Sequence, residues 1–185
     1  VSFSELVEED KQGKENYCYT IDDGDIEISR IINPRVTGRK QRVIEVTLDD
    51  GEKIVCTPDH TFMLRDGSFK AAACLTSSDS LMPLTRKKSA IGGKITISGY
   101  EMVLNPRNHQ WVFTHLLADE FNLDNGRYSL QEGDHRHHID FNKLNNNPDN
   151  ILRLPKQEHI KLHRTQAAKT LNRRDVREKL LKLHQ

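Results

Sequence analysis

Residues 135–163 read HRHHIDFNKLNNNPDNILRLPKQEHIKLH, and the rest of the chain is interpreted around them. This stretch holds five of the nine histidines in the 185-residue chain, together with five asparagines and three carboxylates. Imidazole and carboxylate side chains are common ligands of divalent metals, and a neutral imidazole is the usual general base near pH 7. The stretch therefore predicts a metal site with a general base beside it.

The order of the histidines suggests how such a site is built. His137 and His138 are adjacent, so on a β-strand they would point to opposite faces, one toward a metal ion and one toward an attacking water. Pro155 stands where a helix is expected to begin, and His159 and His163 then fall at positions i and i+4 on one face of it. These spacings predict a site of three histidines, at positions 137, 159 and 163, between a strand and a helix.

Composition limits the classes of protein to which the chain can belong. Hydrophobic residues make up 35% and charged residues 30% of the sequence, and no apolar run approaches the roughly 20 residues that cross a bilayer. The start, VSFSELVEED, lacks the basic segment and apolar core of a secretory signal. The three cysteines are widely separated, which is typical of reduced thiols. We therefore expect a cytoplasmic protein of a bacterial or phage-type setting, with no membrane partner.

Charge is distributed unevenly, although the net charge is only +1. Residues 1–30 carry nine acidic and three basic side chains, whereas residues 151–185 carry ten basic and three acidic ones. The gradient predicts that the C-terminal part faces a polyanion; a solvated charged helix is the alternative. Phosphate contacts would make binding to double-stranded DNA sensitive to salt. The candidate contacts are Arg136, Lys143, Lys161, Arg164, Arg173 and Arg174.

Short β-hairpins are predicted in the first 84 residues. Residues 43–48 and 53–57 are two β-branched runs joined through Asp-Gly, which is typical of a hairpin. Further strand pairs are expected around the turns at 22–25 and 65–67.

After these hairpins, the segment 85–94 begins TRKKSAIGG and is expected to be a linker. Beyond it we expect a hairpin over 95–104 and a helix over 111–121, where apolar residues recur at helical spacing. The C-terminal segment is expected to be helical, with an interruption near residue 172.

The histidine stretch also resembles a known family. Residues 137–163 follow the pattern H-H-I-D-x-N-K-x-x-N-x-P-x-N-[IL]-x-x-L-x-x-x-x-H-x-x-x-H, which is similar to the HNH endonucleases of the ββα-metal fold. The similar form occurs in homing endonucleases of mobile introns and inteins. The resemblance implies that His138 is the general base that activates water and that His137 and His159 bind the metal ion. It gives Asn150 the role of constraining the loop between the strands.

This resemblance covers roughly residues 95–165 and leaves some roles open. His163 matches a further metal ligand that only some branches possess, and many relatives have Asp at the position of His137. A structural zinc site is the alternative for the three histidines. His135 is expected to be a bystander, and Asp140 either orients a histidine or caps the turn. The cation implied is Mg²⁺, with Mn²⁺ or Zn²⁺ as alternatives.

A second resemblance lies in residues 54–84, which read IVCTPDHTFMLRDGSFKAAACLTSSDSLMPL. The T-x-x-H block formed by Thr57 and His60, followed by D-G and A-x-x-L, looks like an intein splicing domain of the Hint fold. In that family the threonine and histidine activate the peptide bond at the amino-terminal splice junction. The chain departs from the family because it begins at Val1 rather than at a Cys or Ser nucleophile, and the closing splicing blocks are missing. We expect a splicing-incompetent remnant, with the missing remainder of a split or truncated intein as a candidate partner.

The sequence as a whole predicts an α+β protein in two parts. A β-rich partial Hint-like domain (1–84) and a linker (85–94) are followed by an HNH nuclease domain (95–165) and a helical basic extension (166–185). The predicted function is hydrolysis of DNA by an intein-derived homing endonuclease. The alternatives are an autoprocessing intein fragment and a non-catalytic DNA-binding module with a structural metal site. The oligomeric state stays open, with a monomer favoured.

Overall fold

The computed structural model describes residues 2–174 and 176, and it divides the chain into two compact units. The first unit is Val1–Lys87 with Val103–Trp111, and the second is Lys88–Met102 with Val112–Gln185. Short helices and small antiparallel sheets make up both, which confirms the α+β class at this level. Among the described helices, none combines the length and the apolar character needed to span a membrane.

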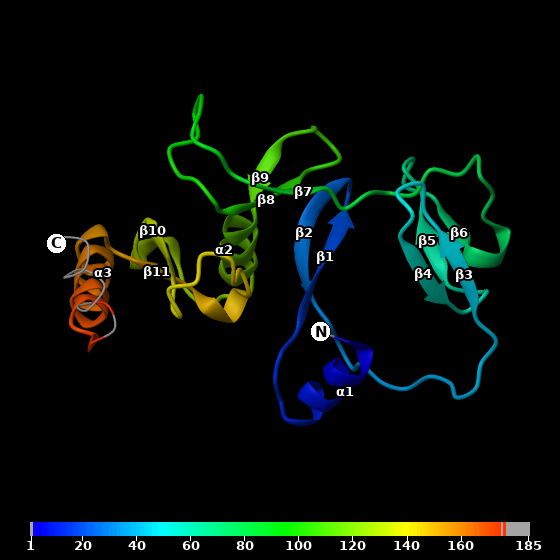
Figure 1. Ribbon diagram of the computed structural model, residues 1–185, viewed down its shortest axis with the longest axis horizontal. Helices are drawn as coiled ribbons and strands as arrows, with labels where there is room; N and C mark the ends of the chain where they lie inside the picture. The colour runs from blue at the N-terminus through cyan, green and yellow to red at the C-terminus, as the bar shows by residue number, and fades with distance from the viewer. Residues whose placement is uncertain (1, 175, 177–185) are drawn as a thin grey trace. The chain divides into compact units, whose positions relative to one another are not determined.

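The first unit contains a helix and three hairpins (Figure 1, blue to cyan). The helix is α1 (Phe3–Lys11). The hairpins pair β1 (Tyr17–Asp22) with β2 (Asp25–Arg30), β3 (Ile44–Thr47) with β4 (Lys53–Cys56), and β5 (Thr61–Met63) with β6 (Phe69–Ala71). A 3-10 turn, η1 (Ala72–Cys74), follows. The three hairpins predicted from the Asp-Gly turns are confirmed.

Three short strands form a sheet in the order β7-β8-β9: β7 (Arg86–Lys88), β8 (Glu101–Leu104) and β9 (Trp111–Phe113). The hairpin predicted over 95–104 is wrong, because residues 101–104 are the central strand of this sheet. The segment expected to be a linker is not wholly irregular, since part of it forms β7. The helix predicted over 111–121 begins only at residue 114, because Trp-Val-Phe are strong strand formers and pair with β8.

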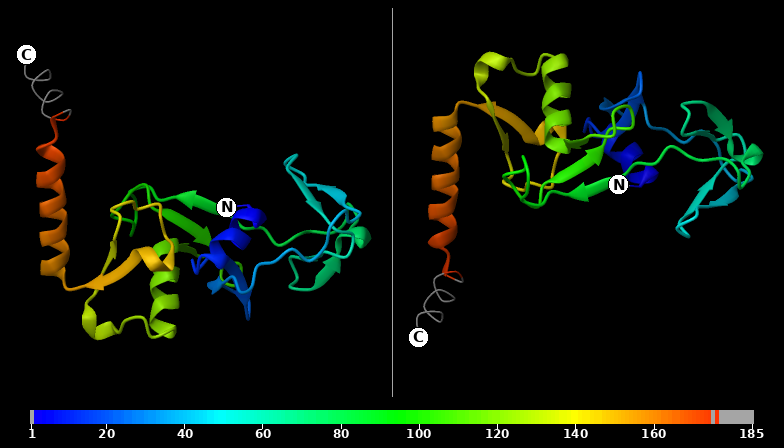
Figure 2. Two further views of the ribbon diagram at one scale, coloured as in Figure 1. Left: turned by 90° about the horizontal axis from the view of Figure 1, so that it is seen from below. Right: turned by 90° about the horizontal axis from the view of Figure 1, so that it is seen from above.

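The second unit places a helix, a hairpin and a further helix in succession. They are α2 (Thr114–Asp124), the 3-10 turn η2 (Leu130–Glu132), β10 (His135–His138), the 3-10 turn η3 (Pro148–Asn150), β11 (Ile151–Leu154) and α3 (Lys156–Leu171). Strands β10 and β11 are antiparallel, and Figure 2 shows β11 leading directly into α3. Helix α3 ends at Leu171, so the predicted interruption near residue 172 is confirmed. The last part of the predicted basic extension, residues 177–185, lies outside the described residues.

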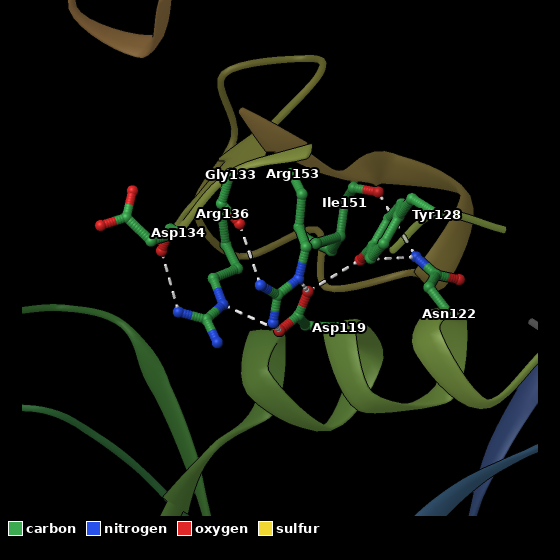
Figure 3. A network of polar contacts seen from close by, with 8 residues as sticks. All are labelled: Asp119, Asn122, Tyr128, Gly133, Asp134, Arg136, Ile151 and Arg153. Atoms are coloured by element: carbon green, nitrogen blue, oxygen red, sulfur yellow. Dashed lines mark hydrogen bonds and ion pairs between the residues drawn. The ribbon is translucent and has the colours of Figure 1, made fainter. Parts of the chain in front are cut away.

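A buried ion-pair network fastens α2 to the β10–β11 hairpin (Figure 3). The Asp119 carboxylate is only 3% exposed and accepts hydrogen bonds from Arg153 Nε at 2.7 Å and Arg153 Nη2 at 2.6 Å. It also accepts from Arg136 Nε at 2.8 Å and from the Tyr128 hydroxyl at 3.0 Å. Burial by itself would raise the pKa of Asp119, but these donors hold that pKa below its ordinary value. The carboxylate is therefore ionised and joins one helix to both strands.

Two further contacts continue this network. Arg153 Nη1 donates to the carbonyl oxygen of Gly133 at 3.0 Å, and Asn122 donates to the carbonyl oxygen of Pro148 at 2.8 Å. Gly133 has a φ of 144°, and a Cβ at this position would come within 2.2 Å of the Leu154 carbonyl oxygen. Only glycine fits there, so the start of β10 is fixed against the end of β11.

Asp119→Ala is expected to destabilise the protein strongly. It leaves the guanidinium of Arg153, which is 5% exposed, buried without its carboxylate. Removing one partner of a buried ion pair costs about 3–5 kcal/mol. Urea unfolding followed by far-UV circular dichroism measures the change. The matched control is Asp124→Ala, an exposed carboxylate on the same helix, which should shift the free energy of unfolding by less than about 0.5 kcal/mol. Equal effects of the two substitutions would contradict a structural role for the network.

Candidate functional site

Three imidazoles converge between β10 and α3. One nitrogen from each of His137, His159 and His163 lies within 4.8 Å of the other two. The ring centroid of His137 is 5.3 Å from that of His159 and 5.1 Å from that of His163. The Nε2 atoms of His159 and His163 are 3.2 Å apart, as expected for positions i and i+4 of one helix. The structure therefore brings together the three histidines that the sequence predicts.

Burial favours the neutral form of two imidazoles in the cluster. Burial lowers the pKa of His137, and the neighbouring histidines 163, 159 and 138 lower it further. Burial likewise lowers the pKa of His159. His137 is 4% exposed, and its Nδ1 has no hydrogen-bond partner among the described residues. An unpartnered buried nitrogen beside two other imidazoles is the kind of atom that a bound metal ion completes.

The donor set bears on which metal would bind. The three converging groups are all imidazoles, with no carboxylate among them. Imidazole suits Zn²⁺, Ni²⁺ and Co²⁺, whereas Mg²⁺ prefers oxygen ligands. The residues therefore fit a divalent transition metal better than the predicted Mg²⁺, although the identity of the cation stays a prediction.

His138 has surroundings of its own. Its ring centroid lies 5.8 Å from that of His115 and 6.1 Å from that of Tyr100, away from the rings that contact His137. Its Nε2 is 3.0 Å from Oδ1 of Asn146. If Nε2 carries the proton in this contact, Nδ1 keeps a free lone pair. The prediction that the two adjacent histidines separate into different environments is confirmed.

Asn150 braces the loop between β10 and β11. It is 8% exposed, and its side-chain Nδ2 donates to Asp140 Oδ1 at 2.9 Å and to the Asn145 carbonyl oxygen at 2.8 Å. Its Oδ1 accepts the backbone N–H of Asp140 at 3.0 Å. The Asp140 carboxylate also accepts from Asn142 N–H and from Asn145 Nδ2, so it holds the loop and not a histidine. The amide of Asn150 thus closes the turn that follows His138.

A cleft of about 560 Å³ lies over these residues. The histidines that line it are His138, His159 and His163, and the basic residues are Arg136, Lys143 and Arg164. An aromatic residue, Phe141, also lines it, with its ring 4.8 Å from that of His137. His138, two of the three clustered histidines and several cationic side chains therefore face one cavity.

The predicted DNA contacts are not all at this cleft. Arg136 is there, but its Nε binds Asp119 and its Nη1 binds the Asp134 carbonyl oxygen, so it serves the fold. Lys161 is exposed and lies two residues from His159 and His163, about 200° around the helix, so it faces away from the cluster. Arg173 and Arg174 are exposed beyond the end of α3. Lys143 and Arg164 also line the cleft, where the Lys143 Nζ donates to the Ser98 carbonyl oxygen.

Sequence reasoning missed the importance of His115. Its ring contacts those of Tyr100, Phe113 and His138, and its Nδ1 is buried without a partner in the described part of the chain. Burial first, and then the charge of His138, lowers the pKa of His115 to about 4. Its position on α2 carries no spacing signal, so only the fold reveals it. The expected bystander His135 also has a role in packing, since its ring stacks on that of His159 at 5.2 Å.

Thr57 and His60 lie in the first unit. They are the ends of a tight turn in which the His60 N–H donates to the Thr57 carbonyl oxygen at 3.1 Å. The Thr57 hydroxyl donates to the Asp59 carboxylate and lowers its pKa. The His60 ring is exposed and packs edge-on against Phe62 at 5.0 Å. The two residues of the predicted splicing block are thus held side by side.

Comparison with known proteins bears on these two sites. The family model of the intein splicing domain matches residues 1–183. The chain belongs to the intein splicing domain family. It is also 58% identical, over 187 residues, to a DNA gyrase B protein from Synechocystis sp.. That alignment covers 100% of this chain and 17% of the gyrase protein, so the chain spans a small part of its relative.

The family assignment confirms the intein-derived part of the prediction. It supports the splicing alternative more directly than it supports a nuclease, because a splicing domain acts on peptide bonds. Nuclease activity, DNA binding and the choice of cation stay predictions about this intein splicing domain.

The histidine cluster is expected to bind Zn²⁺ or Ni²⁺. His163→Ala removes one of three ligands and should weaken metal binding by at least roughly 100-fold. Loss of a residue that only hydrogen-bonds to a metal ligand already weakens binding by about 10–100-fold. Competition against a chromophoric chelator at pH 7.5 measures the dissociation constants. The control is His60→Ala, which removes a histidine outside the cluster. Equal affinities for wild type and His163→Ala would rule out this site.

His115 is expected to make stability depend on pH. Its pKa is about 4 in the folded state and 6.5 when unfolded, so between these values the unfolded chain binds a proton that the folded chain lacks. The free energy of unfolding therefore falls as pH drops through this window, by about 1.4 kcal/mol per pH unit. Urea unfolding measures the free energy of unfolding at pH 7 and at pH 5. The decrease in this free energy between the two pH values should be about 2 kcal/mol smaller for His115→Phe than for wild type. A curve for His115→Phe that runs parallel to that of wild type would refute the assignment.

Proposed function

We propose that this intein chain carries a metal-dependent DNA endonuclease at the cleft of its second unit. The observation that carries the proposal is the arrangement of His138 beside the cluster of His137, His159 and His163, all within one strand–strand–helix unit. Hydrolysis of a phosphodiester needs a base for water and a positive charge near the scissile phosphate. The cleft offers residues for both.

In this proposal His138 is the general base. A proton passes from the attacking water to Nδ1 of His138, while Asn146 holds Nε2 and so fixes the ring plane and tautomer. The water oxygen attacks phosphorus, and the 3′ oxygen departs. A divalent cation held by histidines 137, 159 and 163 would stabilise the charge on the phosphate and the leaving oxygen. Lys143 and Arg164 would neutralise neighbouring phosphates of the duplex.

Asn150 has a positioning role in this scheme. Its side-chain amide forms hydrogen bonds with Asp140 and with the Asn145 carbonyl oxygen of the loop. Since the loop also carries Asn146, the brace at Asn150 supports the contact that orients His138. Loss of this brace would affect catalysis through geometry rather than through chemistry.

A second candidate function is favoured by the family assignment. Splicing domains rearrange peptide bonds autocatalytically, and the Thr57–His60 turn of the first unit is the block that would activate such a bond. The 58% identity to a gyrase B protein makes gyrase B the proposed host protein. The two activities use different residues and do not exclude one another.

His138→Ala is expected to abolish DNA cleavage. Loss of a positioned general base lowers hydrolysis by about 10²–10⁴-fold, while the three metal ligands stay intact. Supercoiled plasmid incubated with Zn²⁺, Mn²⁺ or Mg²⁺ provides the assay, with gel separation of nicked and linear products. The matched control is His60→Ala, which belongs to the splicing block and should cut at the wild-type rate. Failure of the wild-type protein to cut a library of host-gene and random sequences with any of these cations would overturn the proposal.

A further inference from the structure

Residues 89–99 connect β7 to β8 and form an arm in the second unit (Figure 1, narrow green loop). At its base Ser89 is 5% exposed. The Ser89 N–H donates to the Tyr100 carbonyl oxygen at 2.7 Å, and the Ser89 carbonyl oxygen accepts from Gly99 N–H at 2.8 Å. The Ser89 hydroxyl donates to the Ile97 carbonyl oxygen at 3.0 Å. The two sides of the arm are therefore tied together where it leaves the sheet.

The tip of the arm is also closed. Gly92 and Ile95 exchange both backbone hydrogen bonds, at 3.1 and 2.9 Å, around a two-residue turn. Gly93 has a φ of 56°, which this turn requires and which few residues other than glycine adopt. The arm is thus a formed hairpin, and a ligand that binds it loses little affinity to ordering.

The side chains of the arm suggest its ligand. Ile91 is 73% exposed at the tip, and Lys88 and Lys94 on either side of it in sequence are exposed as well. Residues 85–100 include no acidic side chain. An exposed branched apolar residue flanked by lysines matches the side chains that proteins insert between base steps from the minor groove, with cations on the adjacent phosphates.

The base of the arm reaches the histidine cleft. Lys143, which lines the cleft, donates from Nζ to the Ser98 carbonyl oxygen at 3.0 Å. Its Nζ also lies 5.3 Å over the ring of Tyr100, another lining residue. The space beside Gly99 is filled by Lys143, because a Cβ there would lie 2.7 Å from Nζ. A duplex that occupies the cleft would therefore lie next to the arm.

We infer that residues 89–99 are a DNA-binding arm in which Ile91 enters the minor groove and partly unstacks a base step, while Lys88 and Lys94 contact phosphates. The inference rests on the proposed function, because the arm would hold the duplex with its scissile strand at the histidine cleft. It adds an apolar wedge and two cations to the phosphate contacts proposed for Lys143 and Arg164.

The test measures binding without cleavage. The full chain is titrated in EDTA onto a fluorescein-labelled duplex of mixed sequence, and anisotropy is recorded at several salt concentrations. Ile91→Ser is expected to weaken binding about tenfold at every salt concentration, because the apolar contact is lost and no charge changes. Lys94→Gln is expected to lower the slope of log K against log [salt] by about 1. The matched control is Leu130→Ser, which removes a 68% exposed apolar side chain from the same unit and should bind like wild type.

A second readout reports the wedge itself. An adenine analogue in the duplex whose fluorescence rises on unstacking should brighten with wild type and not with Ile91→Ser. The proposed role of the arm is wrong if wild type and Ile91→Ser bind the duplex with equal affinity and raise the fluorescence equally. It is also wrong if the wild-type protein binds no duplex. If the wild-type protein binds DNA through Ile91 but does not cleave it when divalent cations are added, the proposed nuclease activity is wrong while the DNA-binding role of the arm is supported.

Discussion

The buried carboxylate of Asp119 is the contact on which the second unit depends. It accepts from Arg153 through two nitrogens and from Arg136 through one, so a single group on α2 holds both strands of the β10–β11 hairpin. A buried ion pair of this kind adds little net free energy compared with apolar packing. The paired contacts of the Arg153 guanidinium with the Asp119 carboxylate, however, fix the position of the hairpin relative to α2. In that arrangement His137 lies opposite Leu152 and faces α3. A slip of one residue would exchange His137 with its neighbour and move the proposed base into the metal site.

Unsatisfied polar atoms gather around the histidines. In the described residues, the buried side-chain atoms without a hydrogen-bond partner are His115 Nδ1, Asn122 Oδ1, His137 Nδ1 and Asn146 Nδ2. Three of the four belong to the cluster or to the surroundings of His138. Buried polar atoms are usually paired, so these atoms are the ones in this region that a bound water or ligand would satisfy. The lowered pKa values of His115 and His137 have the same origin, since burial disfavours their charged forms.

Local patterns in the sequence predict the structural features that depend on residues close together in the chain. The Asp-Gly turns gave the hairpins, and the i, i+4 spacing gave the pairing of His159 with His163. What the patterns missed depends on contacts distant in sequence. The sequence around Ser98-Gly99 predicts a local hairpin, whereas residues 101–104 pair with the more distant β7 and β9, and Met102 and Val103 are buried there. The contact between Arg136 and Asp119 joins residues 17 positions apart, and no local pattern predicts it. His115 has a role only because α2 packs beside β10.

The course of the chain bears on how the two candidate activities relate. Residues 103–111 belong to the first unit, where Asn105 and Arg107 bind the Asp25 carboxylate at 2.9 and 2.8 Å. The chain therefore enters the second unit at residue 88, returns to the first, and leaves it again after residue 111. Truncation of the chain within 85–94 would remove both of these partners of Asp25, so residues 1–84 do not form an independent segment. Yet the Thr57–His60 turn and the histidine cluster are each completed by contacts within their own unit. The splicing-domain match spans both units, so the Thr57–His60 turn and the histidine cluster both lie within the residues that the family model matches.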